Sequence, residues 1–196
     1  KEHIMLEFTA TADLKDDNVK EKYRDKIIYN YPLLEFRQSG YTKEFQNFAT
    51  DATPWERTLM AMIVSEYRRY LFADVGKNIK PVLLMKSSNI PQSEEQYRLF
   101  YEKLESIAPA DLNPLYSYGI LQLDTALNYF KNKDESMNLL VDSIRYSFSK
   151  EKAIIINSKT DNTDEKQRLL NSLEDKDNHI RIIFTVDMLN EGWDVL

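Results

Sequence analysis

The fold is decided by residues 182–195, which read IIFTVDMLNEGWDV. The β-branched and apolar residues of 180–186 predict a buried strand. Asp187 then suits the N-cap of one helical turn, and Gly192 ends that turn before the chain becomes extended again. Open α/β sheets place their ligand chemistry just beyond the carboxyl ends of strands, and Asp194 follows such an end. The stretch therefore predicts an α/β sheet with a site at that edge.

Two earlier apolar runs predict partners for this last strand. Strands are expected at 82–86, 153–157 and 181–186. Helical segments separate them, and strand–helix alternation is typical of a parallel sheet with right-handed crossovers. We therefore expect the three strands to be members of one parallel sheet, rather than antiparallel hairpins.

Helical spacing of apolar residues is clearest in residues 54–73, where Glu66 lies on the same face as the apolar positions. A second helix is predicted at 93–107, with Ser93 as its N-cap. A polar helix is predicted at 163–174. Residues 26–37 predict a strand, a turn at Pro32 and a short helix that ends near Gly40.

Residues 109–150 are helical in pattern, with expected breaks at Asn113–Pro114 and Asn132–Lys133. This segment is too long for an ordinary connection between a helix and the next strand. We interpret it as an inserted helical hairpin.

The composition narrows the classes of function. The 196 residues carry a net charge of −6, which argues against a freestanding general nucleic-acid binder but leaves room for a local basic groove. There are no cysteines, so disulfides and thiolate metal sites are excluded. No run of 18 apolar residues exists in the sequence, and no membrane span is expected.

A phosphate-binding loop of the G-x-x-x-x-G-K-[ST] type is absent, since the four glycines of the chain do not have that spacing. The two histidines of the chain have no carboxylate cluster nearby, so no metal site is expected. Taken alone, the triplet Thr9-Ala10-Thr11 is also typical of threonines that cap a turn after a strand. The stretch D-x-x-x-E-G-W-D at 187–194, taken alone, is also typical of a helix end with a C-cap glycine and a buried tryptophan.

Considered in order, the motifs resemble those of superfamily 2 helicases and translocases. Residues 9–11 (TAT) resemble motif III, residues 80–88 (KPVLLMKSS) motif IV, and residues 184–195 motif V. The sequence MLNEGWDV is most similar to the corresponding motif in the restriction (Res) subunit of type III restriction–modification enzymes. Residues 31–35 with Gly40-Tyr41 resemble the segment that connects the two RecA-like domains of such motors.

The resemblance implies an α/β fold, a RecA-like parallel sheet with flanking helices and a helical insertion. By this reading, residues 1–12 are the end of the first RecA-like domain and 13–52 the connection between domains. Residues 53–196 are then the second RecA-like domain, incomplete at its carboxyl terminus, with the insertion at about 109–150. We expect the chain to be part of a longer protein.

The resemblance also implies roles for individual residues, none of them catalytic in this part of the protein. Coupling of the ATP state to domain closure would involve Thr9 and Thr11. Gly192 and Asp194 would contact ATP, because a carboxylate can accept from two ribose hydroxyls and glycine allows close approach. The residues expected to bind DNA are Lys86, Ser87, Ser88 and Thr185. Thr185 is included among the DNA-binding residues because Val186 occupies the position that is often threonine in related helicases.

The cofactors and partners follow from the same resemblance. ATP and Mg²⁺ would be bound mainly by regions outside this chain, where the phosphate-binding loop, the acidic motif and the arginine of motif VI are expected. The partners would be double-stranded DNA and a DNA methyltransferase (modification) subunit, with no membrane, in the bacterial cytoplasm. Two alternatives stay open: a repair-type superfamily 2 helicase, and a non-enzymatic α/β interaction domain.

We predict that the isolated chain hydrolyses no ATP, because it lacks the loop and lysine that hold the β- and γ-phosphates. Phosphate release by the purified chain, measured with and without DNA, should equal the buffer blank. A DNA-stimulated ATPase activity that co-purifies with the chain would contradict this prediction.

Overall fold

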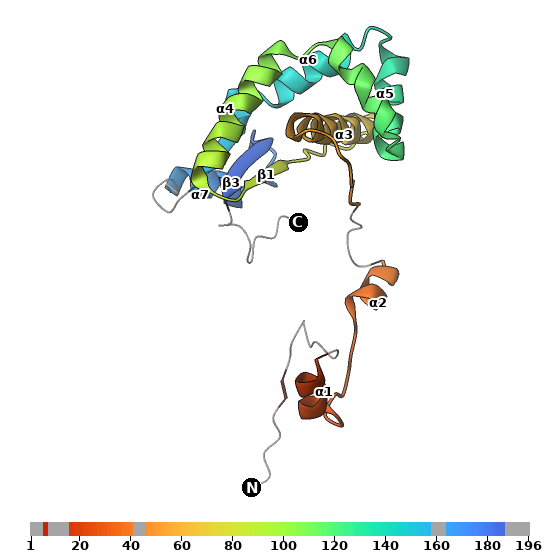
Figure 1. Cartoon of the computed structure of the whole chain (residues 1–196), viewed down its shortest axis with the longest axis vertical. Helices are drawn as coiled ribbons and strands as arrows, with labels where there is room; N and C mark the ends of the chain where they lie inside the picture. The colour runs from red at the N-terminus through yellow and green to blue at the C-terminus, as the bar shows by residue number, and fades with distance from the viewer. Residues whose placement is uncertain (1–5, 8–15, 41–45, 158–163, 187–196) are drawn as a thin grey trace. The chain divides into compact units, whose positions relative to one another are not determined.

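A computed structural model describes residues 6–7, 16–40, 46–157 and 164–186 (Figure 1). The internal contacts divide the chain into two compact units, Lys1–Asn47 and Phe48–Leu196. The predicted domain boundaries at 12 and 52 stay predictions, as does the reading of residues 109–150 as an insertion.

The first unit contains two short helices, α1 (Asp17–Tyr23) and α2 (Leu33–Gln38). The predicted strand at the start of 26–37 is wrong, because the described residues there are irregular up to α2. Ile28 and Tyr29 are exposed, and no described strand pairs with this apolar run. The short helix before Gly40 is confirmed.

The second unit holds the sheet and most of the helices. Its elements, in chain order, are α3 (Pro54–Asp74), β1 (Leu83–Ser87), α4 (Ile90–Ser106), the 3₁₀ helix η1 (Pro109–Tyr118), α5 (Leu121–Lys133), α6 (Asn138–Ser147), the 3₁₀ turn η2 (Lys150–Lys152), β2 (Ala153–Ile156), α7 (Asp164–Asn171) and β3 (Ile182–Val186).

The three strands form one parallel sheet in the order β1-β3-β2, as predicted from the strand–helix alternation. The last strand in the sequence is therefore the central one. In its register, Ile183 lies opposite Leu84 of β1 and Ile154 of β2. A central strand buried on both faces needs a continuous apolar run, which explains the composition of 182–186.

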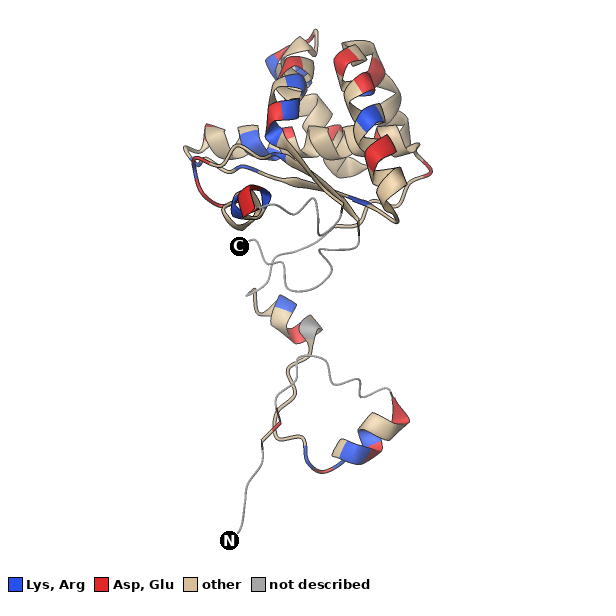
Figure 2. Ribbon diagram, turned by 90° about the vertical axis from the view of Figure 1, so that its left-hand side faces the viewer, with Lys and Arg blue, Asp and Glu red and all other residues tan. Residues whose placement is uncertain are grey.

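The two faces of the sheet belong to two separate hydrophobic clusters. Ile182 and Phe184 of β3 pack in the larger cluster with residues from α3, α4, α5 and α6. Ile183 points to the opposite face and packs in a smaller cluster with Leu170 and Leu173 from α7 and the turn after it. The alternation of side chains along β3 thus joins the two layers of helices into one α/β/α arrangement. Figure 2 shows residues of both charge signs interspersed along the helices.

Helix α3 confirms the helix predicted at 54–73. Thr53 accepts a hydrogen bond from the backbone N–H of Glu56, and the Glu56 carboxylate accepts one from the backbone N–H of Thr53. This capping box, with Pro54 in the first turn, fixes the start of the helix.

Ser93 is not the N-cap of the helix predicted at 93–107. Helix α4 begins at Ile90 and is capped by Asn89, whose Oδ1 accepts from the backbone N–H of Gln92 at 3.0 Å. Asparagine is as good an N-cap as serine, and Pro91 is favoured in the first helical turn. Ser93 instead lies inside the helix and is buried.

The segment 109–150 is helical, but its first predicted break is wrong. Helix η1 runs through Asn113–Pro114, and the chain turns at Gly119, whose φ of 60° is left-handed. The second predicted break coincides with the end of α5 at Lys133. Helices α5 and α6 both pack on α3, so this segment shares the larger core with the sheet (Figure 1).

Among the described helices, none is long and apolar enough to cross a membrane.

Phe184 is the best single test of the core, because its ring meets Tyr97 and Phe100 at centroid distances of 5.2 and 5.3 Å and is fully buried. We predict that Phe184→Ala lowers the free energy of unfolding by about 3–5 kcal/mol, measured by urea titration. Leu84→Ala, at a strand position that is 42% exposed, is the control and should cost much less. Equal costs for the two variants would refute this packing.

Candidate functional site

The parallel register brings the ends of all three strands together. Lys86 of β1 and Ile156 of β2 both lie opposite Thr185 of β3. We call this end of the sheet the carboxyl edge; it comprises residues 86–88, 156–157 and 185–186. Two of the residue groups predicted to bind DNA, from strands about 100 residues apart in sequence, are therefore neighbours here.

The three predicted residues at the end of β1 differ in how accessible they are. Lys86 and Ser88 are exposed at the edge. Ser87 is buried, and its hydroxyl donates to Oε1 of Gln96 in α4 at 2.7 Å. The backbone N–H of Ser88 donates to Oε1 of Gln92 at 3.1 Å. Ser87 and the two glutamines thus fasten the start of α4 to the end of β1.

Thr185 has a more enclosed position than the sequence suggested. Its side chain is 1% exposed, and its hydroxyl donates to the backbone carbonyl of Val186 at 2.9 Å. In this rotamer, the hydroxyl is engaged within the protein. Its proposed contact with DNA stays a prediction.

Four other predicted residues lie outside the described part of the chain. Thr9 and Thr11 fall in 8–15, and Gly192 and Asp194 fall in 187–196. Their roles in coupling and in ATP binding stay predictions.

Sequence reasoning missed two polar residues at the carboxyl edge. Asn157 follows β2 directly, and Ser93 lies in the first turns of α4, which begins where β1 ends. Both are buried. Within the described residues, neither Oδ1 of Asn157 nor Oγ of Ser93 has a hydrogen-bond partner. An orphaned buried polar atom costs about 1–3 kcal/mol, so two at one edge call for an explanation. For Asn157, the available signal in the sequence was a polar residue directly after the apolar run AIII.

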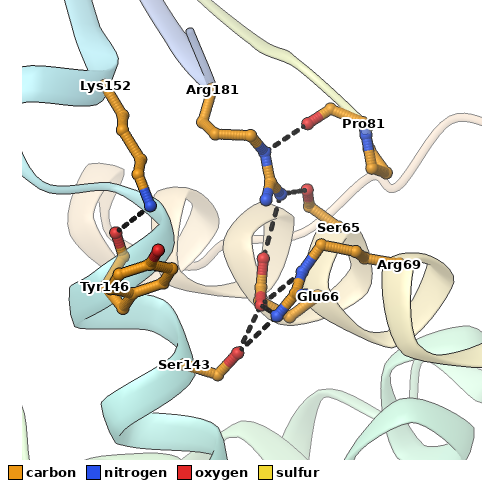
Figure 3. A network of polar contacts seen from close by, with 8 residues as sticks. All are labelled: Ser65, Glu66, Arg69, Pro81, Ser143, Tyr146, Lys152 and Arg181. Atoms are coloured by element: carbon orange, nitrogen blue, oxygen red, sulfur yellow. Dashed lines mark hydrogen bonds and ion pairs between the residues drawn. The ribbon is translucent and has the colours of Figure 1, made fainter. Parts of the chain in front are cut away.

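The other end of β3 is held by a buried ion pair (Figure 3). Glu66 of α3 is fully buried, and its Oε1 accepts from Nη2 of Arg181 at 2.9 Å. The same guanidinium donates to Oγ of Ser65 at 3.0 Å and to the carbonyl of Pro81 at 2.8 Å. Arg181 directly precedes β3, so these bonds connect the beginning of β3 to α3 and to the segment that leads into β1.

The second carboxylate oxygen of Glu66 is also satisfied. Its Oε2 accepts from Nη2 of Arg69 at 2.7 Å and from the hydroxyl of Ser143 in α6. Arg69 in turn donates to that hydroxyl at 2.9 Å. Nearby, Lys152 lies over the Tyr146 ring and donates to its backbone carbonyl at 3.1 Å. The Glu66 network therefore joins α3 and α6 to Arg181, which directly precedes β3.

The network sets the protonation of its acid. Burial by itself raises the pKa of Glu66, but hydrogen bonds from Arg69 and Ser143 and the positive charges of Arg181 and Arg69 lower it by more. The net pKa of Glu66 lies below its ordinary value of 4.5, so the carboxylate is ionised near neutral pH. The network is polar but enclosed, and it acts as a brace for the strand that carries the site.

These features define the class of protein. A parallel sheet with its last strand in the centre, helices on both faces and polar residues at the carboxyl edge is a RecA-like α/β architecture. Residues 48–196 form such a unit within the described ranges.

Comparison with known proteins identifies the particular family. Over its whole length the chain is 37% identical to the probable type III restriction-modification enzyme HindVIP Res subunit of Haemophilus influenzae, in an alignment of 215 residues. The chain therefore belongs to the family of type III Res subunits, as the resemblance implied, and the assignment of its residues to motifs III to V stays a prediction. It spans 42% of the length of this relative. No protein-family model matches the chain, and no solved structure matches it.

The Glu66 network predicts a dependence of stability on pH. Because the pKa of Glu66 is lower in the folded than in the unfolded state, its contribution is complete above pH 4.5 and is lost as the pH falls through the folded-state pKa. We predict that Glu66→Gln lowers the free energy of unfolding by about 3 kcal/mol near neutral pH. The difference from the unsubstituted chain should shrink as the pH falls below 4.5 through the folded-state pKa of Glu66.

Urea titrations at a series of pH values measure this difference. The exposed Glu135 provides a matched control, and Glu135→Gln should leave the stability nearly unchanged at every pH. A pH-independent difference between the unsubstituted chain and Glu66→Gln would contradict the assignment of an ionised, braced Glu66.

Proposed function

We propose that the chain is part of an ATP-dependent DNA translocase or helicase motor of a type III restriction endonuclease. In that role, ATP hydrolysis by the intact protein would be coupled to movement along DNA and to cleavage. The observation that carries the proposal is the 37% identity to a Res subunit over the entire chain. It favours this function over a repair-type helicase and over a non-enzymatic interaction domain.

The carboxyl edge is the surface that this proposal assigns to DNA. Lys86 contributes an exposed positive charge, and Ser88 contributes an exposed hydroxyl beside it. Phosphate contacts of this kind position a protein on the duplex without reading its sequence. Ser87 supports them by its bond to Gln96, which holds the start of α4. Thr185 would join the contact by releasing the carbonyl of Val186 and turning to a different rotamer.

Under the same proposal, this chain contributes only a small part of the ATP and Mg²⁺ binding site. Gly192 and Asp194 would contact the nucleotide, and Thr9 and Thr11 would couple its state to the closure of the two motor domains. The residues that hold the phosphates and the metal ion would come from other parts of the intact protein. The chain's share is then mainly to position DNA and to communicate with the nucleotide.

Partners and location follow from the relationship. The intact protein would act on double-stranded DNA and would assemble with a DNA methyltransferase (modification) subunit in the bacterial cytoplasm. The net charge of −6 means that DNA attraction has to come from a local group rather than from the whole surface.

We predict that the chain binds a short fluorescein-labelled duplex with an affinity that falls as salt rises, measured by fluorescence anisotropy. Lys86→Ala should weaken binding and reduce the slope of log affinity against log salt by about 1, because one phosphate contact is lost.

Lys77 supplies the matched control. It is also exposed, but it lies in the segment before β1, away from the carboxyl edge. Lys77→Ala should leave both the affinity and the slope unchanged. Equal effects of the two substitutions would mean that DNA does not bind at the carboxyl edge.

A further inference from the structure

Asn157 has an environment that its position at a strand end does not explain. It directly follows β2, and its side chain is only 2% exposed. Within the described residues, its Oδ1 has no hydrogen-bond partner. A buried amide is normally bonded, so the exception points to a partner outside the described residues.

Asn178, the other buried asparagine, shows what a structural amide looks like in this protein. Its Oδ1 accepts from the backbone N–H of Ile180 at 2.9 Å and from Nζ of Lys80 at 3.1 Å. Its Nδ2 donates to the carbonyl of Leu169 at 2.7 Å and to Oγ of Ser172 at 3.1 Å. Asn178 therefore fastens the turn that precedes β3. The Oδ1 of Asn157, by contrast, has no such partner among the described residues.

The register places Asn157 at the carboxyl edge. Ile156 lies opposite Thr185, and Thr185 lies opposite Lys86. Asn157 is the next residue along β2, so it continues the line of strand ends that begins at Lys86 and crosses β3. Ser93, whose hydroxyl also lacks a partner among the described residues, lies in the first turns of α4, which starts at the same edge. The unpartnered polar atoms are thus on the side of the sheet where DNA is proposed to bind.

We propose that Asn157 is a further DNA-contacting residue, which extends the contact from β1 across the carboxyl edge to β2. The inference rests on the proposed function. A phosphate oxygen only accepts hydrogen bonds, so the contact uses the donor end of the amide. A half-turn of the amide exchanges its two ends and places Nδ2 where the unpartnered Oδ1 lies, and Nδ2 then donates to a phosphate oxygen of the DNA backbone. The contact is neutral, so it positions the backbone and does not attract it from a distance.

A role in binding DNA predicts a combination of changes in melting temperature and DNA affinity that a purely structural role would not produce. Asn157→Ala removes an amide whose oxygen has no partner among the described residues, so the melting temperature should stay within about 2 °C. The dissociation constant for a fluorescein-labelled duplex should rise about threefold to tenfold. The salt slope should not change, because no charge is lost.

Two variants of the full chain serve as references. Asn178→Ala should lower the melting temperature clearly, because it breaks four bonds of a buried amide, yet leave DNA affinity per folded molecule unchanged. Lys86→Ala should lower the salt slope. Asn157→Asp keeps the shape of the side chain and should weaken binding more than Asn157→Ala does, since a carboxylate repels phosphate.

The outcomes separate the two proposals. If the unsubstituted chain binds duplex DNA and Lys86→Ala weakens it, but both Asn157 variants bind like the unsubstituted chain, only the role of Asn157 is overturned. A melting temperature lowered as much as in Asn178→Ala, with unchanged affinity, would make Asn157 structural and overturn it as well. If the unsubstituted chain binds no DNA, or Lys86→Ala has no effect, the proposed function of the edge fails and the inference fails with it.

Discussion

The rest of the second unit depends on the buried pair between Glu66 and Arg181. Two charges taken out of water are costly unless all their hydrogen-bonding groups are satisfied, and here both carboxylate oxygens have partners. The guanidinium also holds a serine hydroxyl and a main-chain carbonyl. Because the correct partners come together in only one arrangement of α3, α6 and β3, the pair selects that arrangement over other ways of packing apolar helices on a sheet.

The consequence reaches the opposite end of β3. The strand is five residues long, so its start at Ile182 and its end at Val186 move as one rigid element. Apolar packing on both faces holds it laterally, through Phe184 on one side and Ile183 on the other. A brace at one end and two cores along the length leave the carboxyl edge well defined, which is what the proposed contact with DNA would require.

The strands and the main helix were predictable because their signals are local. A run such as AIII at 153–156, or a capped apolar repeat such as that of α3, carries its information within a few residues. The start of α4 was predicted wrongly because Ser93 and Asn89 are both good N-caps. Pro91 favours Asn89, since proline is preferred in the first turn of a helix. The partners of Glu66 could not be predicted at all, since Arg181 lies 115 residues away and nothing local marks it. At the site, Lys86 and Thr185 were identified by resemblance, but the burial of Thr185 and the unpartnered amide of Asn157 follow only from packing.

The order β1-β3-β2 has a consequence for how the chain acquires its structure during synthesis. Neither β1 nor β2 pairs with the other, and both wait for residues 182–186. On the ribosome, some 100 residues of helix and unpaired strand must therefore emerge before the first ladder can close. The helices from α3 to α6 make contacts that are nearer in sequence and can assemble earlier, as a platform. The sheet then forms by a single insertion event, and until it happens two apolar strand edges are open to association with other chains.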